Sequence, residues 1–204
     1  MANKLNNITF DNFKWLNEPA HWSLSDNVLM LRTDREKDFW QETWYNFNHN
    51  SGHVYGTELS EDFTVEICVE ADFKTLYDQA GLMLYVDEKN WVKAGIEYTD
   101  GLPMISSVVT KEFSDWGTGV FTGNPNKFWL KLMKVGNVVC IKYSIDNEAW
   151  LLLRLCQFPI SEKYFVGPMS CTPTREGLTV KFSGLKFSEP VKDILPIKYF
   201  KKIF

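Results

Sequence analysis

The sequence lacks long apolar runs and an excess of positive charge. No apolar stretch approaches the roughly 18 residues that cross a bilayer, and the N-terminus has neither the apolar segment nor the cleavage site of a secretory signal. Lys and Arg number 22 against 26 Asp and Glu, so the net charge is −4. Binding to nucleic acid depends on clustered Lys and Arg. We therefore expect a cytoplasmic protein that binds neither nucleic acid nor membranes.

Cysteine clusters and cofactor motifs are also lacking. The four cysteines form no C-x-x-C pair, and Cys68, Cys140 and Cys156 lie in strand-like runs, which predicts buried free thiols. His49 and His53 would align two imidazole rings only on a helix, whereas the surrounding residues predict a loop. We expect His53 to be a loop residue bonded to the following strand. No phosphate-binding glycine loop or dinucleotide fingerprint is present, so we expect no metal and no cofactor.

Helical periodicity is absent, and a period of two takes its place. The run from Phe63 to Glu70 alternates apolar and other residues, as a half-buried strand does. Nine further runs share this pattern: 28–33, 79–86, 91–98, 104–110, 128–135, 138–145, 150–155, 164–170 and 178–187. Gly136-Asn137 between two of them predicts a two-residue hairpin. We predict an all-β fold, a two-sheet antiparallel jelly-roll sandwich, in one domain over residues 1–189.

The segment 190–204 differs in composition from the rest. Four Lys and one Asp give it a net charge of +3, so the first 189 residues carry −7. If its last eight residues form a helix, Ile197, Phe200 and Phe204 share one face. We expect this basic, apolar tail to dock on the acidic body of its own chain. The alternative is contact with a second subunit, which would make the protein a homo-oligomer.

Two consecutive strand-like runs carry the candidate binding face. In the later run one face is apolar, and the other presents an aromatic ring, a cation, a glycine and an anion: Trp91, Lys93, Gly95 and Glu97. Glycine within a strand often marks the close approach of a ligand or of another backbone. In the earlier run the corresponding face starts at Gln79 and includes Tyr85. If the two runs pair, a polar floor forms between Trp91 and Tyr85.

This mixture of side chains suits a sugar. A sugar has an apolar ring face that packs on aromatic rings and a rim of hydroxyl groups that bond to carboxylate, amide and ammonium groups. The alternative is a solvated strand face with an ordinary Lys–Glu pair. The residue types alone leave both interpretations open.

A set of short motifs runs in order along the chain as far as about residue 187. They are Trp15-Leu-Asn-Glu-Pro19, Asp38-Phe-Trp40, Asn50-Ser-Gly-His53, Tyr77-Asp-Gln-Ala-Gly-Leu-Met83, Trp91-Val-Lys-Ala-Gly-Ile-Glu97, Val108-Val-Thr110, Ser114-Asp-Trp116, Arg154 and Gly167-Pro-Met-Ser-Cys-Thr-Pro173. Through them the chain resembles a bacterial and fungal family of unknown function that includes the fungal regulation of enolase protein. Two positions depart from that family: Gly117 stands where it has serine, and Asn147 where it favours a turn glycine.

The resemblance implies a fold and a modest functional expectation. The family adopts a concanavalin A-like lectin/glucanase jelly roll, and its members lack an established catalytic activity. Its fungal member is a cytoplasmic protein tied to the control of carbohydrate metabolism. A fold alone does not fix a function.

An enzymatic interpretation needs a second carboxyl group beside Glu97. Retaining glycosidases hold two such groups about 5–5.5 Å apart and inverting ones about 6.5–9.5 Å apart. Glucanases of this fold carry several acids along one strand, whereas Gly95 and Lys93 occupy the positions before Glu97. The second carboxyl group would have to come from Asp78 or Asp115. We keep a glycan-active enzyme that uses Glu97 with one of them as an alternative.

The sequence thus favours a non-enzymatic jelly-roll protein that binds a saccharide or sugar-derived ligand on its concave face. We also expect a link to carbohydrate metabolism, with a protein partner there. The candidate ligand-binding residues are Trp40, Asp78, Gln79, Lys93, Glu97, Asp115, Trp116 and Arg154. Arg154 has a structural alternative, an ion pair with Asp78 or Asp115. A protein-interaction scaffold that oligomerises through the tail is the second functional alternative.

Each candidate residue has an expected role. Gln79, Lys93 and Glu97 would hydrogen-bond sugar hydroxyls or a uronate, because they supply amide, ammonium and carboxylate groups. Trp40 and Trp116 would stack on the ring face of the sugar.

Overall fold

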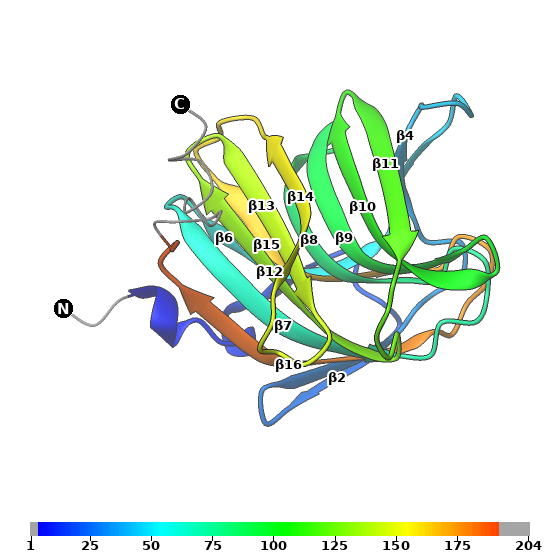
Figure 1. The fold of residues 1–204 in the computed structure, drawn as a ribbon, viewed down its shortest axis with the longest axis horizontal. Helices are drawn as coiled ribbons and strands as arrows, with labels where there is room; N and C mark the ends of the chain where they lie inside the picture. Colours follow the sequence, from blue (N-terminus) through cyan, green and yellow to red (C-terminus); the bar gives the residue numbers. More distant parts are fainter. Residues whose placement is uncertain (1–3, 192–204) are drawn as a thin grey trace, which may run out of the picture.

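The computed structural model describes residues 4–191, and almost all regular structure in that part of the chain is β-strand (Figure 1). Two short 3-10 helices, η1 (Lys4–Asn7) and η2 (Phe10–Asn12), precede the first strand. Within residues 4–191 no helix is long and apolar enough to cross a membrane. The C-terminal tail that we expect to dock on the body spans residues 190–204. All but its first two residues lie outside the part of the chain that the structure describes.

Two seven-stranded antiparallel sheets form the body. Sheet A has, in spatial order, β1 (Lys14–Leu16), β6 (His53–Leu59), β15 (Tyr164–Cys171), β8 (Gln79–Asp87), β9 (Asn90–Thr99), β10 (Leu102–Lys111) and β11 (Phe113–Val120). Sheet B has β14 (Leu151–Gln157), β13 (Val138–Ser144), β12 (Lys127–Val135), β7 (Phe63–Ala71), β16 (Thr179–Ser188), β3 (Val28–Arg32) and β2 (His21–Ser25). A separate hairpin joins β4 (Phe39–Gln41) to β5 (Asn48–Asn50). This confirms the predicted two-sheet jelly-roll sandwich.

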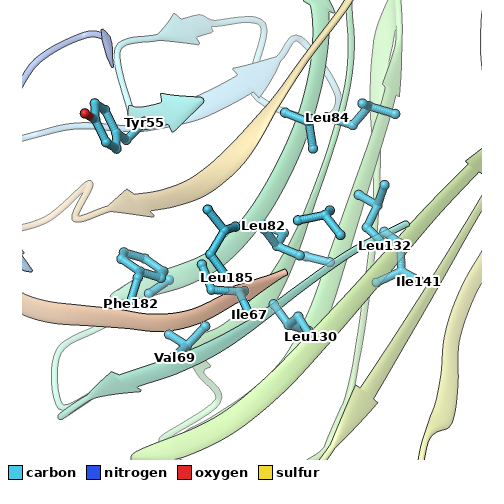
Figure 2. Close-up of a cluster of buried hydrophobic side chains, with 14 of the residues drawn as sticks. Tyr55, Ile67, Val69, Leu82, Leu84, Leu130, Leu132, Ile141, Phe182 and Leu185 are labelled. Carbon is cyan, nitrogen blue, oxygen red and sulfur yellow. The ribbon is translucent and has the colours of Figure 1, made fainter. Parts of the chain in front are cut away.

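The main core lies between the two sheets. Figure 2 shows Leu82 and Leu84 of β8 extending toward Leu130 and Leu132 of β12, and all four side chains are fully buried. Alternation along each strand places these apolar residues on one face. Removing one such side chain from water contributes about 1.5–3 kcal/mol. The period of two in the sequence is therefore the signature of this interface.

A second, smaller apolar cluster lies on the opposite face of sheet A. It consists of Phe39, Val54, Met83, Trp91, Val108, Met169 and Cys171. Phe39 belongs to the β4–β5 hairpin, and its ring lies 5.9 Å from the ring of Trp91. The hairpin therefore covers part of the outer face of sheet A. This corrects the expectation that Trp91 borders an open floor, because its side chain is fully buried beneath the hairpin.

The predicted pairing of the two candidate strands is confirmed. β8 and β9 are antiparallel neighbours, with Gln79 opposite Glu97 and Gly81 opposite Gly95. A Cβ atom on Gly95 would lie 2.0 Å from the carbonyl oxygen of Ala80. Glycine is required there by another backbone, which is one of the two explanations that the sequence offers. The predicted hairpin at Gly136-Asn137 is also present, between β12 and β13.

His53 departs from its predicted loop environment. It begins β6 and is fully buried. Its Nε2 accepts the N–H of Asp34 at 3.1 Å, and its Nδ1 lies 2.7 Å from the carbonyl oxygen of Asn17. Nδ1 therefore carries the proton and donates it, and the ring is neutral. Burial lowers the pKa of His53, although the bond to Asn17 and the charge of Asp34 act in the opposite direction.

The cysteines are free thiols in the structure. Cys68 and Cys140 are buried as expected, and Cys156 is half-buried. Cys171 lies in the small cluster under the hairpin, where burial raises the pKa of its thiol to about 12. A thiol with so high a pKa stays protonated and unreactive at neutral pH.

Candidate functional site

A pocket of about 460 Å³ lies between the outer face of sheet A and the β4–β5 hairpin. In Figure 1 this hairpin stands beside β11, at the end of the molecule far from the N-terminus. Six aromatic residues line the pocket: Trp40, Trp44, Tyr45, Phe47, Tyr77 and Trp116. The polar residues that line it are Asp38, Thr43, Gln79, Lys93 and Glu97. Aromatic walls with a few convergent polar groups are typical of a small-molecule site.

The aromatic walls come from segments that are distant in sequence. Trp40 and the loop after it belong to the hairpin, Tyr77 precedes β8, and Trp116 lies on β11. The ring of Trp116 lies 6.4 Å from that of Trp40 at an interplanar angle of 87°, and 6.4 Å from that of Tyr77 at 73°. The ring of Trp116 is thus steeply inclined to both of its aromatic neighbours in the pocket.

Glu97 forms the acidic part of the floor. Its side chain is 6% exposed. Oε1 accepts a hydrogen bond from Gln79 Nε2 at 3.2 Å, and Oε2 accepts bonds from Ser106 Oγ at 2.7 Å and from Trp116 Nε1 at 2.9 Å. Burial raises the pKa of Glu97, while the charge of Lys93 and the bond from Ser106 act to lower it. Trp116 therefore both lines the wall and orients the carboxylate.

Lys93 connects the hairpin to the sheet. Its Nζ donates to Asp38 Oδ1 at 3.1 Å and to the carbonyl oxygen of Phe39 at 2.9 Å. Burial alone would lower the pKa of Lys93, but the adjacent carboxylate of Asp38 raises it above its usual value. The ammonium group is therefore charged, and its bonds are directed to the base of the hairpin. This differs from the direct ligand contact that the sequence predicts, because two protein acceptors already occupy the group.

Asp78 does not line the pocket, although it precedes Gln79 directly. Its side chain is fully buried, and it accepts Arg175 Nε at 2.7 Å and the backbone N–H groups of Lys74 and Thr75. Because side chains alternate across a strand, Gln79 faces the pocket and Asp78 faces away. The proposed pairing of Asp78 with Glu97 or with Arg154 is therefore wrong.

Asp115 and Arg154 form the structural ion pair that the sequence left as an alternative. Arg154 Nη2 lies 3.0 Å from Asp115 Oδ2. Asp115 is on β11, the edge strand of sheet A, and Arg154 is on β14, the edge strand of sheet B. The pair joins the two sheets, and neither residue lines the pocket. Of the eight candidates, the structure brings together five: Trp40, Gln79, Lys93, Glu97 and Trp116.

Sequence reasoning missed the pocket residues of the hairpin loop. Trp44, Tyr45 and Phe47 are exposed, and Trp44 is 87% exposed. The φ angle of Trp44 is +70°, in the left-handed region that non-glycine residues seldom adopt. Three aromatic residues in a segment with loop character were the available signal, because an exposed aromatic cluster often marks a binding surface. Tyr77 and Asp38 carried no such signal.

The fold and the pocket together define a class: a β-sandwich protein with a ligand-sized aromatic pocket on the outer face of one sheet. Residues 15–190 match the family described as protein of unknown function (DUF1349). The chain belongs to this family. It is 45% identical, over 177 residues, to regulation of enolase protein 1 of Saccharomyces cerevisiae, an alignment that covers 87% of this chain and 89% of that protein.

Solved structures share the fold of this chain. A functionally unknown protein from Saccharomyces cerevisiae superposes with a TM-score of 0.88 at 43% identity, over 90% of this chain and 100% of that one. A carbohydrate-binding module, CBM66 from Bacillus subtilis, superposes with a TM-score of 0.55 at 14% identity, over 90% of this chain and 98% of the module. At 14% identity the second likeness shows a shared fold and nothing more.

Proposed function

We propose that this protein binds a saccharide or sugar-derived ligand in the aromatic pocket and does not catalyse its conversion. The observation that carries the proposal is the combination of six aromatic side chains with Gln79 and Glu97 on one floor. Aromatic faces pack against the C–H face of a sugar ring, while amide and carboxylate groups bond to its hydroxyls. A carbohydrate-binding module of the same fold is a supporting likeness.

The pocket residues have two proposed roles: some contact the ligand, and one holds the hairpin in place. Trp40 and Trp116 supply walls against which a sugar ring stacks, and Glu97 accepts hydroxyl hydrogen bonds. Lys93 acts as a positioning residue, because its bonds to Asp38 and Phe39 hold the hairpin over the sheet. The ligand therefore lies between a fixed floor on β8 and β9 and a wall supplied by the hairpin.

The carboxyl groups favour binding over hydrolysis. Glycosidases of both stereochemical classes use two carboxyl groups on either side of the scissile bond. Here Asp78 is paired with Arg175 and Asp115 with Arg154, both outside the pocket, and Asp38 in the pocket is paired with Lys93. Glu97 is the pocket acid that no described residue neutralises by an ion pair.

The binding proposal is tested by tryptophan fluorescence during titration with mono-, oligo- and uronic saccharides. Trp116→Phe shortens a pocket wall and removes the indole N–H that orients Glu97, and Trp22→Phe is its matched control. Both indoles are 39% exposed and donate to a glutamate, but Trp22 lies on β2 of sheet B. We expect a saturable response in the wild type and the control, with affinity at least about tenfold weaker in Trp116→Phe, which corresponds to about 1.4 kcal/mol. Equal affinity in all three proteins, or no response, contradicts the proposal.

We extend the proposal to a role in the cytosol, where the ligand-bound protein would act on a protein partner in carbohydrate metabolism. Its support is the relative named regulation of enolase protein 1, at 45% identity. The test measures the activity of purified enolase with and without this protein, in the presence and absence of the saccharide that binds. A ligand-dependent change in enolase activity is expected, and unchanged activity under all conditions contradicts this extension.

A further inference from the structure

The lining of the pocket has one more acidic than basic side chain. The charged residues that line it are Asp38, Lys93 and Glu97. Lys93 and Asp38 form an ion pair at 3.1 Å, and the charge of Lys93 also acts on Glu97. Glu97 forms no ion pair with any residue in the described part of the chain, although its side chain is 6% exposed. Buried charges in proteins are usually paired with an opposite charge, because the loss of hydration is otherwise not recovered.

Burial raises the pKa of Glu97, and the hydrogen bonds that the carboxylate accepts act in the opposite direction without neutralising its charge. Gln79, Ser106 and Trp116 donate three bonds to the two carboxylate oxygens, and such bonds favour the ionised form. Oε2 receives two of these bonds and Oε1 receives one. Because an ionised carboxylate has about four acceptor positions, Oε1 retains room for a donor that enters from the pocket.

The aromatic rings around this carboxylate suit a compact cation. The face of an aromatic ring is negative, and it attracts an ammonium group that lies within about 6 Å of the ring centroid. Trp40, Tyr77 and Trp116 line the same pocket, and Trp116 is inclined at 87° to Trp40 and at 73° to Tyr77 while its indole N–H is directed to Glu97 Oε2. Sites lined by several aromatic rings are a known way of recognising organic ammonium ligands.

We propose that the pocket binds an organic ammonium group, and that its ligand is an amino sugar. The ammonium nitrogen donates to Glu97 Oε1 and lies among the rings of Trp40, Tyr77 and Trp116, while the sugar ring packs against the hairpin wall. The inference rests on the proposed saccharide function and narrows its ligand to a cationic class. A metal ion is a poorer occupant, because no group of three His, Cys, Asp or Glu residues within 4–191 is placed to hold one.

Isothermal titration calorimetry of the wild-type protein at neutral pH tests this inference with four ligands. Glucosamine carries the sugar ring and the ammonium group, and glucose and N-acetylglucosamine carry a neutral sugar. Choline carries a quaternary ammonium group without a sugar, and this group keeps the positive charge but has no N–H to donate to Glu97. We expect glucosamine to bind at least about tenfold more tightly than either neutral sugar. Choline should bind measurably but more weakly than glucosamine. The comparison needs no variant, so it does not depend on how a substituted protein folds.

Glu97→Gln locates the effect at the carboxylate. It removes the negative charge while keeping a side chain of similar size, and should abolish the preference for glucosamine over the two neutral sugars. Glu58→Gln, an exposed acid on β6, is the control and should keep the preference. A preference that persists in a folded Glu97→Gln protein overturns the assignment to this residue.

The outcomes separate the inference from the proposed function. Equal affinity for glucosamine, glucose and N-acetylglucosamine overturns the ammonium inference and supports saccharide binding. Binding of choline without any of the sugars supports the ammonium site and overturns both the amino-sugar ligand and the saccharide function. Binding of none of the four overturns the inference, and the wider saccharide panel then decides the proposed function.

Discussion

At the scale of single residues, charged side chains in this protein differ by what surrounds them. Asp78 is buried and neutralised by Arg175, whereas Asp115 pairs with Arg154 at the protein surface. Glu97 is buried but receives only neutral donors. The sequence shows all three as acids near strand ends, and it does not distinguish them because the neutralising arginines lie far away along the chain.

The contrast between Asp78 and Asp115 predicts different stability effects. Asp78→Asn should lower the free energy of unfolding by roughly 3 kcal/mol, near the lower limit for a broken buried pair, because Arg175 is itself 28% exposed. Asp115→Asn removes an exposed pair and should lower it by less than about 1 kcal/mol. Urea denaturation of both variants measures the difference. Similar losses in the two variants would contradict the structural role assigned to Asp78.

His53 predicts a pH dependence of stability. Its pKa is lowered in the folded protein, chiefly by burial, so the unfolded chain binds a proton below about pH 6.5 that the native ring does not. The contribution of His53 to the free energy of unfolding is therefore constant above that pH. Below it, the free energy of unfolding falls as the pH decreases, by at most about 1.4 kcal/mol per pH unit.

The measurement is urea denaturation between pH 5 and pH 8, a range that includes the pKa of about 6.5 of histidine in an unfolded chain. His53→Gln should reduce the loss of stability at low pH. His21 is exposed on β2, and His21→Gln should leave that loss unchanged. A decline that is identical in His53→Gln and the wild type would assign the pH dependence to other groups.

At the scale of elements, the β4–β5 hairpin converts a strand face into a pocket. Its base is fixed by the contact of Phe39 with Trp91 and by the bonds of Lys93, and its loop supplies three aromatic residues. β8 and β9 beneath it approach each other closely through Gly81 and Gly95. The floor of the pocket thus depends on two glycines that do not themselves line it.

Gly95→Ala should therefore disrupt sheet A. The added Cβ would lie 2.0 Å from the carbonyl oxygen of Ala80, and relief requires movement of the backbone, which we expect to cost about 3 kcal/mol or more. Gly117→Ala is the control on β11, because its nearest neighbour would be Arg154 Nη1 at 4.0 Å. That variant should be neutral or stabilised by up to about 1 kcal/mol. Thermal unfolding followed by circular dichroism tests both, and a stable Gly95→Ala protein would contradict the register described here.

At the scale of the whole molecule, much of the architecture could be predicted from the sequence. The alternating runs predict most strands of both sheets, and the pairing of 79–86 with 91–98 follows from their sequence proximity and short turn. Alternation also places Trp91 correctly on the outer face. It cannot show that a hairpin covers that face, so the burial of Trp91 could not be foreseen. The walls of the pocket combine Trp40, Tyr77 and Trp116, which meet only through tertiary packing.

The central claim is that a saccharide occupies this pocket, and the tryptophan indole N–H signals in a ¹H–¹⁵N NMR spectrum test it most directly. The chain has eight tryptophans, of which Trp40, Trp44 and Trp116 line the pocket. On titration with the saccharides, and glucosamine first, these three signals should shift and saturate together. The signals of Trp22, Trp129 and Trp150 in sheet B and its loops should stay in place. Shifts confined to the sheet B tryptophans, or no shift with any saccharide, would contradict the account.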